Sequence, residues 1–142
     1  MVNPKTTQDS YALSLKQPWA ALLASGLKTI EVRNWQTARR GRILIHAARI
    51  PDDRPEAWKQ VPETLKATAA LLGGIVGEAE LTDCVRYASL EDFGRDQGKH
   101  LNDLAWFTGK TLHGFVFANP TLLPFRQFPG WMRFFAVPEA TP

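Results

Sequence analysis

The sequence contains few of the residues that build covalent cross-links and metal centres. Its single cysteine, Cys84, excludes an internal disulfide and a cysteine-based metal site. His100 and His113 have no acidic or cysteine partners at the spacing of metal ligands. We therefore expect no metal ion and no cofactor, and we interpret Cys84 as a small hydrophobic residue in a reduced compartment.

Long apolar runs are also missing. The uncharged stretch near the middle of the chain, from Ala67 to Gly77, has eleven residues, whereas a membrane-spanning helix needs roughly 20. Residues 1–10 are polar and contain no apolar signal-peptide core. No glycine-rich phosphate loop stands out, and neither does a Ser-His-Asp or Cys-His order. These absences predict a cytoplasmic protein that does not contact a membrane.

The composition that remains is that of an ordinary globular domain. Of the 142 residues, 44% are hydrophobic, 22% are charged and 11% are aromatic, which excludes extensive disorder. A chain of this length can bury one core of its own. We expect a flexible segment at residues 1–10, a single domain at 11–138 and a short tail at 139–142.

Positive charge is concentrated in the first part of the chain. Residues 1–54 carry nine Lys or Arg and four Asp or Glu, whereas residues 55–142 carry eight and ten. Between residues 28 and 49 there are six bases and one acid. Such a concentration indicates a site for phosphate or another anion, but a solvated strand-and-turn surface would have the same composition.

Hydrophobic periodicity predicts a strand, a short helix and a buried strand in this region. Residues 11–16 alternate as a half-buried strand does. Pro18 fits the first position of the helix that follows, and Gly26 fits the left-handed residue that ends it. Residues 42–47 are apolar on both faces, which indicates a central strand.

The strand at residues 29–35 is the most informative segment. Its alternation sends Ile30 and Val32 to the core and three polar or aromatic side chains, Glu31, Arg33 and Trp35, to the opposite face. A carboxylate, a guanidinium and an indole would then stand in a row beside the basic turn at residues 38–41.

The second half of the chain predicts short elements in mixed order. These are a helical stretch at 56–72 interrupted by Pro62, a strand at 74–82, short helices and loops at 86–111, strands at 114–119 and 132–137, and a Pro-rich loop at 120–130. Six or so short strands with few helices predict a mainly β (α+β) fold, a small β-barrel decorated by short helices. An α+β sandwich is the alternative.

Three motifs resemble the ASCH domain, a family of PUA-like β-barrels. They are LSLKQPWA at residues 13–20, GxKxxExR at 26–33 and RGRILIHA at 40–47, within a resemblance that covers roughly residues 11–138. The resemblance implies a PUA-like fold with a cleft beside the short helix, lined by residues 28–33. It also implies that RNA, a nucleotide or a nucleobase occupies this cleft.

The residues of these motifs supply the contacts that such a ligand needs. Cationic side chains can contact phosphate, Trp35 can stack on a base, and Glu31 and Gln17 can bond to a base edge, with Arg33 orienting Glu31. The candidate nucleic-acid-binding residues are Lys16, Gln17, Trp19, Lys28, Glu31, Arg33, Trp35, Arg39, Arg40, Arg42 and His46.

Each of these residues also has a purely structural interpretation. Lys28 can neutralise the carbonyl end of the preceding helix, and Glu31 and Arg33 can form a salt bridge. Trp19 and His46 can belong to the core. The other indoles, Trp58, Trp106 and Trp131, are assigned to packing.

The alternative function is that of a small hydrolase, with Lys28 and Glu31 as its catalytic pair. Lys28 would act as a nucleophile or electrostatic stabiliser and Glu31 as a general base. The substrate would be RNA or a modified nucleoside, since one branch of ASCH-like proteins hydrolyses an acylated cytosine nucleoside. That branch has lysine at the position of Lys28, threonine at that of Glu31, and an acid that Glu91, Asp92 or Asp96 would supply. A third hypothesis is an adaptor whose Pro-rich loop at 120–130 and Trp131 contact a protein partner.

Overall fold

The computed structural model describes residues 9–139, so most of the predicted terminal segments, residues 1–8 and 140–142, lie outside the described residues. Its strands are β1 (Ser10–Leu15), β2 (Ile30–Arg33), β3 (Gly41–Ala47), β4 (Gly74–Tyr87), β5 (Leu112–Gln127) and β6 (Phe134–Val137). Its helices are α1 (Trp19–Ser25), α2 (Pro55–Trp58), α3 (Lys66–Ala69), α4 (Leu90–Arg95) and α5 (Gln97–His100), with 3-10 turns η1 (Glu63–Leu65) and η2 (Leu104–Trp106).

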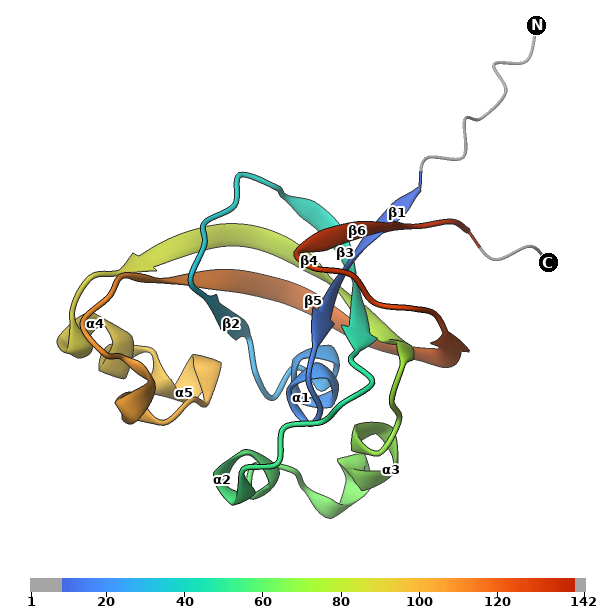
Figure 1. Ribbon diagram of the computed structural model, residues 1–142, viewed down its shortest axis with the longest axis horizontal. Coiled ribbons are helices and arrows are strands. Elements are labelled where there is room, and N and C mark those ends of the chain that lie inside the picture. The colour runs from blue at the N-terminus through green and yellow to red at the C-terminus, as the bar shows by residue number, and fades with distance from the viewer. Residues whose placement is uncertain (1–8, 140–142) are drawn as a thin grey trace, which may run out of the picture.

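The six strands form one curled, mixed sheet, a half-barrel that carries short helices (Figure 1). Their order is β2-β5-β4-β3-β1-β6, in which β1 and β3 run parallel and all other neighbours run antiparallel. The predicted mainly β fold with short helices is therefore confirmed. β3 lies inside the sheet, as its two apolar faces predicted.

The long strands β4 and β5 form the arch of the half-barrel (Figure 1). Their pairing shifts register at three places, between Ile75 and Gly77, between Glu78 and Glu80, and between Leu81 and Asp83. Bulges of this kind bend a strand and increase its twist. The long pair can therefore curve around α1 and reach the helices at both ends of the sheet.

Helix α1 fills the hollow of the half-barrel and forms the centre of the main core. Six of its seven residues, Trp19 to Ala24, are buried. Gly26 ends the helix in the left-handed conformation, as predicted, and its N–H donates to Leu23 O at 3.2 Å. Pro18 lies just before the helix rather than at its first position.

Short helices close the two ends of the hollow (Figure 1). α2, η1 and α3 occupy the stretch where the sequence predicted an interrupted helix, and Pro62 stands between α2 and η1. α4 and α5 lie at the other end, where Phe93 packs with Tyr87 and Val32 in a small separate cluster. This cluster anchors β2 through Val32, which lies between the two polar residues of the strand.

The loop predicted at residues 120–130 is confirmed only for residues 128–130, because β5 continues through Pro120 and Pro124 to Gln127. β2 pairs with β5 only from His113 to Val116, so the later part of β5 has a sheet partner on one side only. A proline is tolerated at such an edge, since its missing N–H removes no bond of the ladder.

Candidate functional site

Strand β2 places polar side chains in a hollow at the edge of the sheet. Ile30 and Val32 are buried, while Glu31 and Arg33 lie on the opposite face, as the alternation predicted. Arg33 Nε donates to Glu31 Oε2 at 2.9 Å, and Arg33 Nη2 donates to the Ser14 carbonyl in β1 at 2.8 Å. Arg33 therefore holds the Glu31 carboxylate in one orientation.

Lys28 lies behind Glu31 and does not line the hollow. Its side chain is 1% exposed, and its Nζ donates to the His100 carbonyl at 2.6 Å and to Asn102 Oδ1 at 3.3 Å. The Nζ is 3.4 Å from Glu31 Oε1 and 4.9 Å from the centre of the Trp19 ring. Burial lowers the pKa of Lys28, and the Glu31 carboxylate opposes that effect. Lys28 thus reaches the hollow only through Glu31.

The segment between β3 and α2 forms another wall. The buried Asp52 accepts a hydrogen bond from Trp19 Nε1 at 2.9 Å, and it accepts three from the guanidinium and one from the backbone N–H of Arg54. The Arg54 bonds, aided by Trp19, hold the pKa of Asp52 far below its usual range although burial acts in the opposite direction. Because the Asp52 N–H donates to Gln17 O at 2.8 Å, this wall is anchored to the start of α1.

Between these walls lies a pocket of about 810 Å³, here called the central pocket. Trp106 and Trp131 contribute aromatic surface to it, and Trp131 is 62% exposed. The Arg54 guanidinium lies 4.1 Å from the centre of the Trp106 ring. Other charged side chains that line the pocket are Lys16, Glu31, Arg33, Asp52, Asp53 and Arg133.

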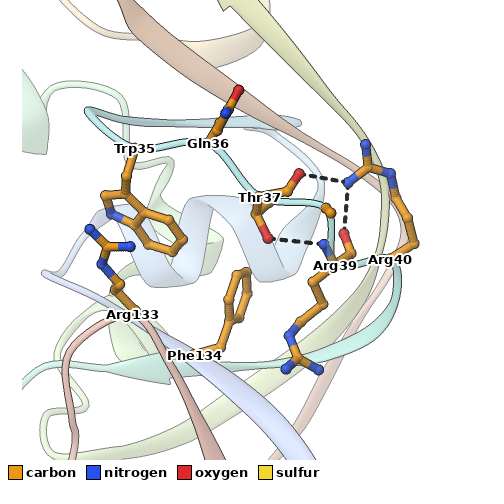
Figure 2. Close-up of a pocket in the computed structure, with 8 residues that line it drawn as sticks. Trp35, Gln36, Thr37, Arg39, Arg40, Arg133 and Phe134 are labelled. Carbon is orange, nitrogen blue, oxygen red and sulfur yellow. Dashed lines mark hydrogen bonds between the residues drawn. The ribbon is translucent and has the colours of Figure 1, made fainter.

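The loop between β2 and β3 borders a second hollow of about 640 Å³, lined by residues 35–40 together with Arg133 and Phe134 (Figure 2). Trp35 and Arg133 line both this hollow and the central pocket, so the two adjoin each other. Two of the predicted contact residues, Arg39 and Arg40, line this second hollow, whereas Glu31 lines the central pocket.

The indole of Trp35 is held on several sides. It makes edge-to-face contacts with Phe115 at 4.9 Å and with Phe134 at 5.6 Å between ring centres. The guanidinium of Arg133 lies 4.7 Å from its ring centre (Figure 2). Trp35 therefore joins the core to the rim of both hollows, while Trp131 presents more open aromatic surface.

Three further predicted residues are placed away from the central pocket. Gln17 is fully buried, donates to two backbone carbonyls next to α3 and accepts from the Ala21 N–H. Arg42 Nε donates to Glu78 Oε1 at 2.6 Å, and Arg42 lines a different hollow. His46 is buried between β1 and the segment that follows β5.

Several pocket residues were missed or misjudged from the sequence. Trp131 was assigned to packing, which is wrong given its exposure, and Trp106 is also partly exposed. Asp52 and Arg54 were treated as loop residues, although an acid and a base two positions apart in the run PDDRP indicated a possible pair. Arg133 carried no local signal, because only the tertiary fold brings it to Trp35.

The acids proposed for the hydrolase are also away from the central pocket. Glu91 and Asp92 pair with Arg95 on α4, and Asp96 accepts from the Tyr87 hydroxyl at 2.6 Å. Within residues 9–139, no three His, Cys, Asp or Glu side chains cluster as metal ligands would. No helix of that part of the chain is both long and apolar enough to cross a membrane.

The sequence has recognisable relatives. The ASCH domain profile matches residues 13–116. Activating signal cointegrator 1 of Mus musculus is 35% identical over 95 aligned residues, and the match covers 58% of this chain and 16% of that protein. The Homo sapiens protein is 38% identical over 88 aligned residues, and the match covers 53% of this chain and 14% of that protein. The chain thus spans about one-sixth of the length of the curated relatives it matches.

Solved structures share the fold at low sequence identity. The ASCH protein of Zymomonas mobilis superimposes with a TM-score of 0.64 at 16% identity, covering 91% of this chain and 87% of that one. A point mutant of the same protein superimposes with a TM-score of 0.65 at 16% identity, covering 92% of this chain and 91% of that one. Likeness at this identity establishes the half-barrel architecture alone.

Proposed function

This chain belongs to the ASCH domain family, and from the geometry of its central pocket we propose that it binds single-stranded RNA or a nucleotide. The observation that carries the proposal is the composition of the pocket wall. Exposed indole surface, an oriented carboxylate and several cations surround one cavity of about 810 Å³. These are the groups that stack on a base, bond to its edge and neutralise its phosphate.

The Glu31 carboxylate is the base-edge contact of this proposal. It is 13% exposed, lines the pocket and is held by Arg33 and Lys28. A carboxylate accepts hydrogen bonds only, so it favours the amino groups of a base. Lys28 contributes by charge and position rather than by touching the ligand.

The indole of Trp131 is the stacking surface. It packs at one side on Phe135, with 6.3 Å between ring centres, and leaves most of its area exposed. Stacking a base on an aromatic side chain contributes about 1–3 kcal/mol. Trp106, with Arg54 over its ring, adds a second aromatic wall.

Phosphate contacts come from cations at the pocket rim. Lys16 is exposed and lines the pocket, and Arg133 stands at its junction with the second hollow. Arg39 and Arg40 continue this cationic rim. Gln17, Arg42 and His46 are left out of the binding surface because their polar atoms are bonded elsewhere.

Fluorescence anisotropy with a short labelled single-stranded RNA tests the proposal. We expect the logarithm of the wild-type affinity to fall linearly with the logarithm of the salt concentration. Trp131→Ala should weaken binding about 5- to 150-fold through the lost stacking. Lys16→Gln should reduce the salt slope by about 0.7, the loss of one phosphate contact on a single strand.

Two further variants complete this experiment. Lys66→Gln removes the same charge from an exposed position on α3 and should bind as the wild type does. Glu31→Gln adds a donor to the carboxylate position and should change the preference among the four homopolymer RNAs. An affinity that is insensitive to salt and to Trp131→Ala would contradict the proposal.

A hydrolase that acts on an acylated nucleoside or on RNA is the second candidate. It is supported by the 3.4 Å separation of Lys28 Nζ and Glu31 Oε1 and by the lowered pKa of Lys28. In this arrangement Glu31 faces the pocket and acts as the general base, while Lys28 tunes it from behind. Turnover of N-acylated cytidine or labelled RNA is the measurement. Activity that survives both Lys28→Met and Glu31→Gln would exclude this pair.

A further inference from the structure

A third hollow adjoins the one beside the β2–β3 loop. This third hollow, of about 380 Å³, shares residues 36–38 and Arg40 with its neighbour and ends at Arg86 and His113, next to the half-buried Cys84. We call the two hollows together the arginine track. The first of them also shares Trp35 and Arg133 with the central pocket, so each of the three hollows shares lining residues with the next, from the central pocket to Arg86.

The arginine track carries cations and no lining acid. Arg39, Arg40, Arg86 and Arg133 line it, whereas neither hollow is lined by Asp or Glu. The ion pair between Arg40 and Asp83 is weak, since Arg40 Nη2 is 3.8 Å from the Asp83 carboxylate and that side chain is 62% exposed. For a chain of net charge +3, four arginines around two adjoining hollows with no lining acid form a marked local excess of positive charge.

Arg39 and Arg40 are held in place mainly by uncharged groups. The Arg39 guanidinium lies 4.1 Å from the Tyr11 ring centre and 5.3 Å from that of Phe134. Arg40 Nη1 donates to the carbonyls of Thr37 and Arg39 at 3.1 and 2.7 Å (Figure 2). A guanidinium stacked on a ring or fixed by the backbone loses less freedom when it binds a phosphate.

The far end of the track is built on paired strands. Arg86 of β4 stands directly opposite His113 of β5, and His113 stands opposite Arg33 of β2. Residues directly opposite on neighbouring strands project to the same face of the sheet. Three nitrogen-rich side chains therefore form a row across the sheet, from the edge of the central pocket to the end of the track.

We propose that the arginine track is a second RNA subsite, which holds the sugar-phosphate backbone of nucleotides that flank the one in the central pocket. This inference rests on the proposed function, and it narrows the ligand to a single strand of several nucleotides rather than a free nucleotide. A backbone that carries one phosphate per nucleotide matches hollows that are lined by several cations and by no acid.

Binding measured against oligonucleotide length tests the proposal. We expect the affinity of the wild type to rise from RNAs of about two nucleotides to RNAs of about twelve as the strand fills the track. Arg86→Gln should leave the binding of the shortest RNA unchanged. The same variant should weaken the binding of the longest RNA several-fold and reduce the salt slope of that binding by about 0.7. Lys66→Gln is the control of equal charge, and equal thermal unfolding midpoints show that the variants are folded.

The outcomes separate this inference from the function on which it rests. If short RNA binds and depends on Trp131, but neither length nor Arg86→Gln matters, the track proposal is overturned and the pocket stands. If long RNA depends on Arg86 but not on Trp131 or Glu31, the track is supported and the pocket proposal fails. Equal affinity for a duplex of the same sequence would overturn the assignment to a single strand.

Discussion

At the residue scale, the buried His46 connects three segments by hydrogen bonds: its own strand β3, strand β1 and the segment after β5. Its Nε2 donates to the Phe128 carbonyl at 2.7 Å, so its Nδ1 is the acceptor for the Ser14 hydroxyl at 2.8 Å. The backbone of Gly130 passes so close that an added Cβ would lie 2.7 Å from the imidazole. Both ring nitrogens are therefore used in the neutral form.

We expect the stability of the protein to fall as the pH drops below about 6.5. Burial lowers the pKa of His46 and of His100, so below the ordinary histidine value the unfolded chain binds protons that the folded chain does not. Asp52, with its pKa held low, adds a second loss only below its ordinary value of 3.8. Urea unfolding at about pH 7.5 and about pH 5.5 measures the first effect.

His46→Gln is the matched variant for this prediction. It should be less stable than the wild type at about pH 7.5, because the Ser14 and Phe128 bonds are disturbed. It should also lose less stability on acidification, because one of the two buried histidines is gone. An unchanged difference between the two pH values would show that His46 does not titrate in this range.

The polar contacts of β2 show how far single residues could be predicted. Alternation alone placed Glu31 and Arg33 on one face, since neighbouring side chains of a strand project to opposite sides. The same local argument could not show that Lys28 is buried, because its partners His100 and Asn102 lie more than 70 positions along the chain. Its role as a support for Glu31 depends on α5 and the residues after it.

At the scale of elements, the contact of α1 with β4 depends on Gly77. A Cβ added at Gly77 would lie 2.6 Å from Ala24 Cβ and 2.6 Å from the Thr121 carbonyl oxygen. Backbone atoms cannot move aside as a flexible side chain does. Gly77 therefore allows the helix to lie directly on the inner face of the arch.

We predict that Gly77→Ala lowers the free energy of unfolding by about 1–3 kcal/mol, the usual result of overpacking a core. Gly98→Ala on α5 is the matched control, because an added Cβ there meets nothing within 4 Å. In a helix this change should stabilise by about 0.5–1 kcal/mol. Chemical denaturation of both variants measures the difference, and equal effects would contradict the close contact.

Elements were predicted best where their signals were local. The stop of α1 at Gly26 and the break at Pro62 depend on one residue each, and both are confirmed. The continuation of β5 past Pro120 was missed because prolines normally end strands. Pro120 and Pro124 are tolerated because β2 ends its pairing with β5 at Val116. The length of β2 is a property of the neighbouring strand and cannot be read from the residues around the prolines.

At the scale of the whole molecule, the position of the charge matters more than its sum. α3 lies away from the β2–β3 loop, on the far side of α1 (Figure 1). Lys66 at its start and Arg39 in the loop are both exposed, and each contributes one positive charge. The proposed RNA site predicts that the charge of Arg39 contributes to binding and that the charge of Lys66 does not.

We expect Arg39→Gln to weaken the binding of a long single-stranded RNA several-fold and Lys66→Gln to leave it unchanged, although both variants have the same net charge. Anisotropy titrations at low and at physiological salt measure this, and the difference should shrink as salt screens the charges. Equal losses would indicate diffuse attraction of RNA to the whole protein rather than a site.

The sequence sufficed for properties that depend on neighbouring residues. These include the alternation of β2, the helix stop at Gly26, the excess of bases before residue 50 and the motifs that mark the family. The central pocket depends on contacts between distant segments: β2, the Asp52–Arg54 wall and the residues around Trp131. These segments meet because the sheet is curled, which places its two edge strands, β2 and β6, at the open sides of one half-barrel. Strand pairing and burial around α1 impose this arrangement together.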